Sequence, residues 1–85
     1  MQITFLDVSE LAPPEPMSVI LQSLSNLAEG CCLQIKHRRE PFPLYEKLTD
    51  AGFAYHCVVH SQDNITLYIY HASDHPFFEQ FIKKQ

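Results

Sequence analysis

The residues that could carry chemistry in this chain are three cysteines, five histidines and a short basic run. Cys31 and Cys32 are adjacent, so their side chains point to opposite faces of a strand, and Cys57 stands alone. This set does not form a disulfide framework, and an odd count without a same-facing pair is typical of a reducing compartment. We therefore interpret the cysteines as small, partly buried apolar residues.

The histidines lack the spacing of a metal site. His56 and His60 are four residues apart on a predicted strand, about 13 Å along it, and His71 and His75 straddle a strand end. The chain has no Cys-x-x-Cys, His-Glu-x-x-His or Glu-x-x-His pattern, no glycine-rich phosphate loop and no supported Ser-His-Asp set. These absences favour a protein that binds rather than catalyses, with no cofactor, no metal ligand and no catalytic residue.

One candidate site remains, at the carboxyl ends of two predicted strands, where ligands of parallel α/β arrangements bind. The residues brought to this edge are Pro13, Pro14, Glu15, Pro16, His37, Arg38 and Arg39, with Asp7, His60 and Ser61 close by. The N–H groups that open a helix and the side chains of arginine both donate hydrogen bonds to anions. We predict that an anion or a partner's carboxylate binds here. The alternative is a pair of solvated loops in which Glu40 or Asp7 holds the arginines.

Length and composition limit the class of protein. The chain has 85 residues, 46% apolar and 19% charged, which allows one domain, residues 1–85, with a modest core. No apolar run approaches the ~20 residues of a membrane span, and the first residues do not resemble a signal peptide. The formal charge of −4 argues against nucleic acid as the main partner. We expect a cytoplasmic domain that binds a protein partner and no membrane.

Apolar spacing predicts the elements that position these residues. Strands are expected over residues 2–6, 31–36, 53–60 and 65–71, and helices over 15–28 and 44–51, with a short C-terminal helix capped by Ser73 or Asp74. Right-handed crossovers place both main helices on one face of the sheet, with the first three strands parallel. The expected fold is α+β, a two-layer β-α-β-α-β-β sandwich with a mixed four-stranded sheet.

The last two strands form a predicted hairpin whose register follows from the parity of their apolar residues. An odd loop is required, and Gln62-Asp63-Asn64 fits, with Asn64 in the left-handed conformation. Val58 then lies opposite Tyr68, and His56 lies opposite Tyr70.

The sheet face without the two main helices is predicted to be aromatic, because it carries His56, Val58, Tyr68 and Tyr70. Such a face needs cover, either from Phe77, Phe78 and Phe81 of the C-terminal helix, from a second copy or from another protein. Single-stranded RNA is an alternative, because aromatic side chains stack bases, but only Lys36 adds positive charge nearby.

Residues 6–17 resemble the opening of TusA/SirA-like proteins, several of which carry sulfur in tRNA thiolation and related relays. Their motif at the first helix is Cys-Pro-x-Pro. Pro14-Glu15-Pro16 matches its second part, and Pro13 stands where the cysteine should be. The chain resembles more closely an uncharacterised family, DUF2249, which has Pro-Pro-Glu-Pro at this place and an acidic Pro-x-Pro-Leu-Tyr segment, matched by residues 40–45. The resemblance implies the sheet order 1-2-4-3.

Together these observations predict a small, non-catalytic binding or adaptor module of the TusA-like superfamily that lacks the sulfur-carrier cysteine. Two alternatives stay open. One is a sulfur-relay protein that carries a persulfide on Cys31, Cys32 or Cys57. The other is a weak binder of single-stranded RNA.

Overall fold

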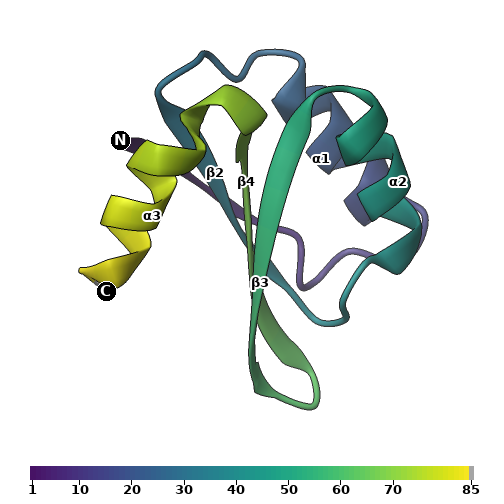
Figure 1. The fold of residues 1–85 in the computed structure, drawn as a ribbon. Helices are drawn as coiled ribbons and strands as arrows, with labels where there is room; N and C mark the ends of the chain where they lie inside the picture. Colours follow the sequence, from purple (N-terminus) through teal and green to yellow (C-terminus); the bar gives the residue numbers. More distant parts are fainter. Residues whose placement is uncertain (85) are drawn as a thin grey trace.

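In the computed structural model, which describes residues 1–84, strands and helices alternate before a final hairpin and helix (Figure 1). The elements are β1 (Gln2–Asp7), α1 (Glu15–Leu24), β2 (Cys31–His37), α2 (Phe42–Asp50), β3 (Phe53–Ser61), β4 (Asn64–His71), the 3-10 turn η1 (Ala72–Asp74) and α3 (His75–Lys83). No helix in this described part is long and apolar enough to cross a membrane.

The sheet is mixed and has the strand order β1-β2-β4-β3. β1 and β2 run parallel, and β4 runs antiparallel to both β2 and β3. The first three strands therefore point in one direction. The α+β class and the strand order are confirmed.

The main core lies between the sheet and the pair α1 and α2, which share one face (Figure 1). Its buried side chains include Ile20 and Leu24 from α1, Leu44 and Leu48 from α2, and Leu33, Ile35, Leu67 and Ile69 from the sheet. Alternate residues of β2 and β4 point to this face, so the period-two apolar pattern of these strands produces the core between sheet and helices.

α1 is shorter than its apolar stripe predicts, since the helix ends at Leu24 rather than at residue 28. Past that point the backbone bonds tighten, with the N–H of Asn26 donating to Ser23 and that of Leu27 donating to Leu24. Such a 3-10 type turn is common at helix ends. This turn keeps Leu27 half-buried against the core, so the apolar pattern continues beyond the last residue of the helix.

The hairpin prediction was right in parity and wrong in register. Ser61 pairs with Asn64, so the loop has only Gln62 and Asp63, and the odd residue is a bulge between Val59 and Ser61. No residue other than glycine has positive φ within residues 1–84, so Asn64 is not left-handed. Consequently Val58 lies opposite Thr66, and His56 lies opposite Tyr68.

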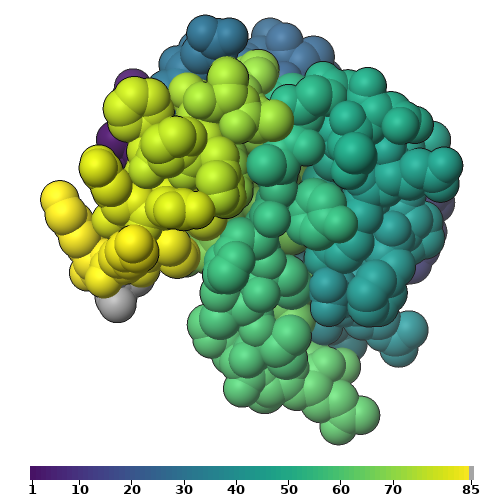
Figure 2. Space-filling view, viewed as in Figure 1, coloured from purple at the N-terminus to yellow at the C-terminus, as the bar shows by residue number. Residues whose placement is uncertain are grey.

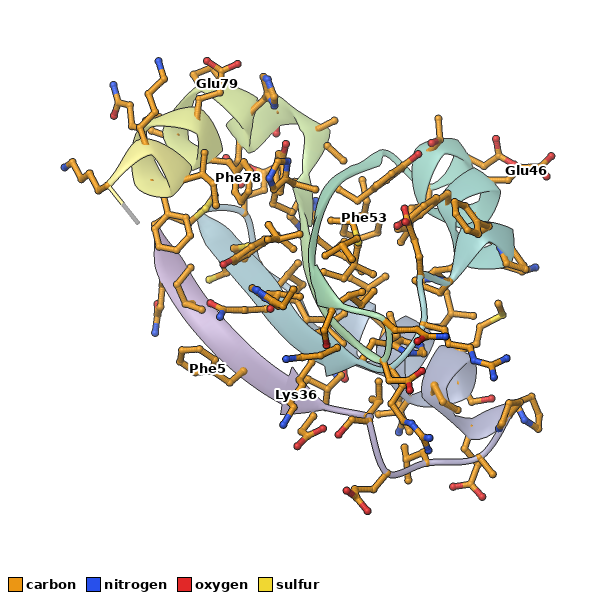
Figure 3. All side chains as sticks on the ribbon, turned by 90° about the horizontal axis from the view of Figure 1, so that it is seen from below. Phe5, Lys36, Glu46, Phe53, Phe78 and Glu79 are labelled. Atoms are coloured by element: carbon orange, nitrogen blue, oxygen red, sulfur yellow. The ribbon has the colours of Figure 1, made fainter. Side chains whose placement is uncertain are left out.

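α3 covers part of the other sheet face, where Phe78 is only 2% exposed (Figure 3). The Phe78 ring stacks on Tyr70 with centroids 4.1 Å apart, and it also contacts Tyr68. Phe81 is half-buried beside them. Phe77 was expected on this side but is 60% exposed, because one residue turns a helix by 100° and places Phe77 outside the contact.

Asp74 occupies the N-cap position of α3, one of the two expected, but its side chain makes no capping hydrogen bond. Neither Ser73 nor Asp74 caps this helix with its side chain. The buried Asp74 carboxylate instead accepts a 2.7 Å hydrogen bond from the N–H of Gly30, and the His71 ring nitrogen Nε2 donates to the carbonyl of Leu27 at 2.7 Å. The turn before α3 is therefore tied to the connection between α1 and β2.

Candidate binding groove

A groove lies between the turn that enters α1 and the loop that enters α2. Its apolar part, of about 310 Å³, is lined by Pro13, Pro14, Pro16, Met17, His37, Pro41 and Pro43. An adjoining part of about 260 Å³ shares Pro13, Pro16 and His37 and is completed by Leu11, Arg38 and Arg39. We call the two parts together the proline groove.

The topology explains why these segments meet. β1 and β2 are parallel neighbours, so the segments that follow them leave the sheet at the same edge (Figure 1). Each segment contains a Pro-x-Pro sequence whose first proline directly precedes a helix and whose second lies in the first turn, 14–16 at α1 and 41–43 at α2. Proline is well suited to the first helical turn, where its missing N–H costs nothing. The same prolines line the groove, so its walls have little backbone freedom.

The predicted anion site at the start of α1 is not what the structure places there. Pro14 and Pro16 have no N–H, the N–H of Glu15 donates to Ala12, and that of Ser18 donates to Pro14. In the first turn of α1, as the structure describes it, only the N–H of Met17 has no backbone acceptor. A single donor is a weak anion site. Positive charge at the groove therefore comes from the arginines.

Arg38 and Arg39 are both exposed at the rim. Within residues 1–84 the structure has one ion pair, between His75 and Glu79. Neither guanidinium is therefore paired with a carboxylate. The two carboxylates expected to hold them are engaged elsewhere. Glu40 accepts a 2.8 Å hydrogen bond from the Tyr45 hydroxyl.

Asp7 is the second of those carboxylates, and it is bonded to its own turn. It accepts hydrogen bonds from the Ser9 hydroxyl at 2.6 Å and from the Ser9 N–H at 2.9 Å. These bonds hold the pKa of Asp7 below its ordinary value. Arg38 additionally lines a small polar hollow with Glu10 and Asp63, whereas Arg39 faces the groove alone.

His37 lies on the boundary between the two parts of the groove. Its Nδ1 accepts a 3.2 Å hydrogen bond from the N–H of Arg39, so the ring proton of the neutral form sits on Nε2. Burial lowers the pKa of His37, which favours that neutral form. The groove therefore has one neutral donor between its apolar part and its basic part.

The other residues predicted for this edge lie outside the groove. Glu15 is exposed on α1 and does not line it. The His60 ring contacts the Thr66 hydroxyl at 2.8 Å and, with Asp7 and Lys36, borders a hollow on the α3 side of the sheet. Ser61 belongs to the hairpin end.

Sequence reasoning missed the apolar character of the site. Pro41 and Pro43 form one wall of the groove but were not among the residues predicted for this edge. The signal was present as a second Pro-x-Pro sequence after a second parallel strand. Leu11 and Met17 also contribute to the lining and were likewise not among the predicted site residues.

The thiols are remote from the groove. Cys32 is fully buried beneath α3, where desolvation raises its pKa to about 12. Cys57 lies on the α2 side beside Tyr45, and burial raises its pKa too. Cys31 begins β2, at the opposite end of the strand from the groove. Burial that disfavours the thiolate disfavours thiol chemistry.

The aromatic face predicted as an interface is partly covered within the chain itself. Tyr68, Tyr70 and Phe78 form one buried cluster with Phe81 and Val58 against it, and the exposed His56 lies 5.8 Å from Phe78. Phe5 and Lys36 lie on the part that α3 leaves open (Figure 3). No group of three or more possible metal ligands was found within the described residues.

The structure thus defines a small α+β fold with a proline-lined groove and, among the described residues, a basic rim without ion pairs. The chain belongs to the family described as "Uncharacterized conserved protein (DUF2249)", whose model matches residues 5–71, as the sequence predicted. The match includes the whole groove and ends before α3. Neither the comparison with curated proteins nor that with solved structures found a match.

Proposed function

We propose that this protein is a non-catalytic binding module whose proline groove takes a segment of a partner protein with an apolar side chain next to a carboxylate. The proposal rests on one observation: an apolar groove lies next to Arg38 and Arg39, and neither guanidinium forms an ion pair. The module is proposed to act in the cytoplasm, which fits its free thiols.

The apolar part supplies affinity. Its walls are proline rings and the Met17 side chain, with His37 as the one polar side chain, so an inserted aliphatic or aromatic side chain meets mostly apolar atoms. Burying one such side chain contributes about 1.5–3 kcal/mol before ordering costs. Because the prolines are already constrained, the groove loses little conformational freedom on binding.

The arginines supply the preference for charge. A guanidinium donates two parallel hydrogen bonds to a carboxylate, a geometry that lysine does not match. Two of the six lysine and arginine residues, Arg38 and Arg39, lie at this rim, in a chain of net charge −4. The rim is thus a local basic site on an acidic protein, which selects an acidic partner by complementarity.

Descent from a TusA-like carrier is supported by the strand order and by the Pro-x-Pro turn at α1. A persulfide relay by this chain is less well supported, because Pro13 replaces the carrier thiol and the thiols of Cys32 and Cys57 are buried with raised pKa values. RNA binding is opposed by the net charge and by α3, which covers Tyr68 and Tyr70.

Selection from a displayed random-peptide library tests the proposal. We expect the protein to enrich peptides in which an apolar residue lies next to an acidic residue or the terminal carboxylate. The same selection on Arg38→Ala/Arg39→Ala should lose the acidic preference. The control Lys83→Ala/Lys84→Ala removes the same charge from α3 and should keep it. Enrichment of uncharged or basic peptides by the unaltered protein contradicts the proposal.

A further inference from the structure

β3 is an edge strand that lacks the usual protection against pairing. In the strand order β1-β2-β4-β3 it pairs with β4 on one side only. Its nine residues, Phe53–Ser61, include no Asp, Glu, Lys, Arg or Pro. Edge strands of monomers are normally blunted by such residues or by bulges. The bulge between Val59 and Ser61 protects one end and leaves residues 53–59 in regular register.

Apolar side chains accompany this free edge. Val59 is 63% exposed, and Tyr55 is 38% exposed on the same sheet face, two alternations away. The Tyr55 ring stacks on Tyr45 with centroids 3.9 Å apart, and Tyr45 meets the exposed Phe42 edge to face. Figure 2 shows β3 running along the surface between α3 and α2. An apolar strip therefore follows the unpaired backbone.

We propose that β3 pairs with β3 of a second copy of this chain, antiparallel and about a two-fold axis, so that two four-stranded sheets become one. A register centred on Cys57 places Tyr55 opposite Val59 of the partner subunit, and the reverse. In this register Tyr55 and Val59 are covered in both copies, and the pairing ends before the bulge. On the other face, His56 lies opposite the partner's Val58.

A second copy can pair here because β3 has no charged residue, even though like net charges oppose association through the rest of the surface. Each copy carries a formal net charge of −4, so two copies meet most easily through a segment without charged residues. β3 is such a segment, and a two-fold contact is self-complementary by construction. An acidic or basic partner strand finds no opposite charge along it. The proline groove is lined by other residues, so the two surfaces act independently.

Sedimentation equilibrium over a dilution series tests the pairing. The unaltered chain should show twice its own mass at high concentration and its own mass on dilution. Val59→Glu and Tyr55→Lys should each give a monomer throughout, because each buries an unpaired charge opposite an apolar side chain of the partner. The combination of both should recover the dimer, since each new carboxylate then faces a new ammonium across the axis.

Two further measurements keep the test decisive. Phe5→Lys, on the other edge strand, should leave the mass distribution unchanged, and far-UV circular dichroism should show each variant folded. Amide hydrogen exchange on β3 should slow as the concentration of the unaltered chain rises. A monomer at every concentration overturns the proposal. So does a dimer that survives Val59→Glu, or one that Phe5→Lys abolishes.

Discussion

The carboxylate of Asp74 accepts a hydrogen bond from the N–H of Gly30, 44 residues earlier, at 2.7 Å. Asp74 is 7% exposed and Gly30 is exposed, so this part-buried contact joins the turn before α3 to the start of β2. Gly30 has φ of 83°, a conformation that glycine adopts without steric cost. The pair fixes where α3 begins, and so where Phe78 meets the sheet.

Removing this anchor should destabilise the fold. Asp74→Ala leaves the Gly30 N–H without its acceptor, and we expect a loss of about 1–3 kcal/mol in the free energy of unfolding, measured with urea. Ser73→Ala, one residue earlier and exposed, should change the same quantity by no more than about 0.5 kcal/mol. Equal stability of the Asp74→Ala protein and the unaltered protein means that the contact does not hold α3.

The two neighbouring phenylalanines of α3 provide a matched pair. Phe78→Ala removes a ring that stacks on Tyr70 and is 2% exposed, and it should cost about 3–5 kcal/mol in unfolding free energy. Phe77→Ala removes the same group from a side chain that is 60% exposed, and it should cost less than about 0.5 kcal/mol. Similar costs at both positions, in one denaturation series, are incompatible with the described docking of α3.

His37 should make stability depend on pH in a defined direction. Burial lowers its pKa below 6.5, so the unfolded chain takes up a proton first as the pH falls. Its contribution is therefore complete above 6.5 and declines as the pH falls through 6.5 toward the folded pKa. NMR titration of the ring should show the lowered value.

The variant His37→Asn separates titration from structure. An asparagine oxygen can accept the N–H of Arg39 at the same i to i+2 spacing but does not titrate. Its unfolding free energy should fall less than that of the unaltered protein between pH 7.5 and 5.5. A ring pKa at or above 6.5 contradicts the assignment.

The cysteines should differ in their reaction with an alkylating agent. Cys31 is half-buried, whereas Cys32 is 0% exposed and has a pKa of about 12. We expect mass spectrometry to find Cys31 modified first and Cys32 modified only after unfolding. A sulfur donor should accordingly leave no stable persulfide on Cys32. Rapid modification of Cys32 in the folded protein contradicts its place beneath α3.

The sequence predicts local patterns better than their ends. The alternation of Leu33 and Ile35 with Gln34 and Lys36 gives the strand and its core face, because side chains of a strand alternate. The bulge at the end of β3 is invisible to that reasoning, since parity is the same whether the odd residue lies in the loop or in the strand. The end of α1 escapes prediction for a similar reason, as a 3-10 turn keeps Leu27 inward.

The topology of the groove follows from the sequence, whereas its apolar lining does not. Topology alone brings Pro13 and Arg38 to one edge, and both line the groove. The expectation of free N–H groups at α1 neglected that proline has no N–H. It also neglected that the N–H groups of Glu15 and Ser18 donate to nearby backbone carbonyls. The apolar walls depend on side-chain packing between two loops, which no spacing rule gives.

Affinity for one selected peptide, measured by isothermal titration calorimetry, tests the proline groove most directly. The account predicts that Arg38→Ala/Arg39→Ala weakens binding about 5- to 150-fold, equivalent to about 1–3 kcal/mol, with unfolding free energy nearly unchanged because both arginines are exposed. Lys83→Ala/Lys84→Ala should bind like the unaltered protein. Undiminished binding by the arginine variant, or an equal loss in the lysine variant, contradicts the account.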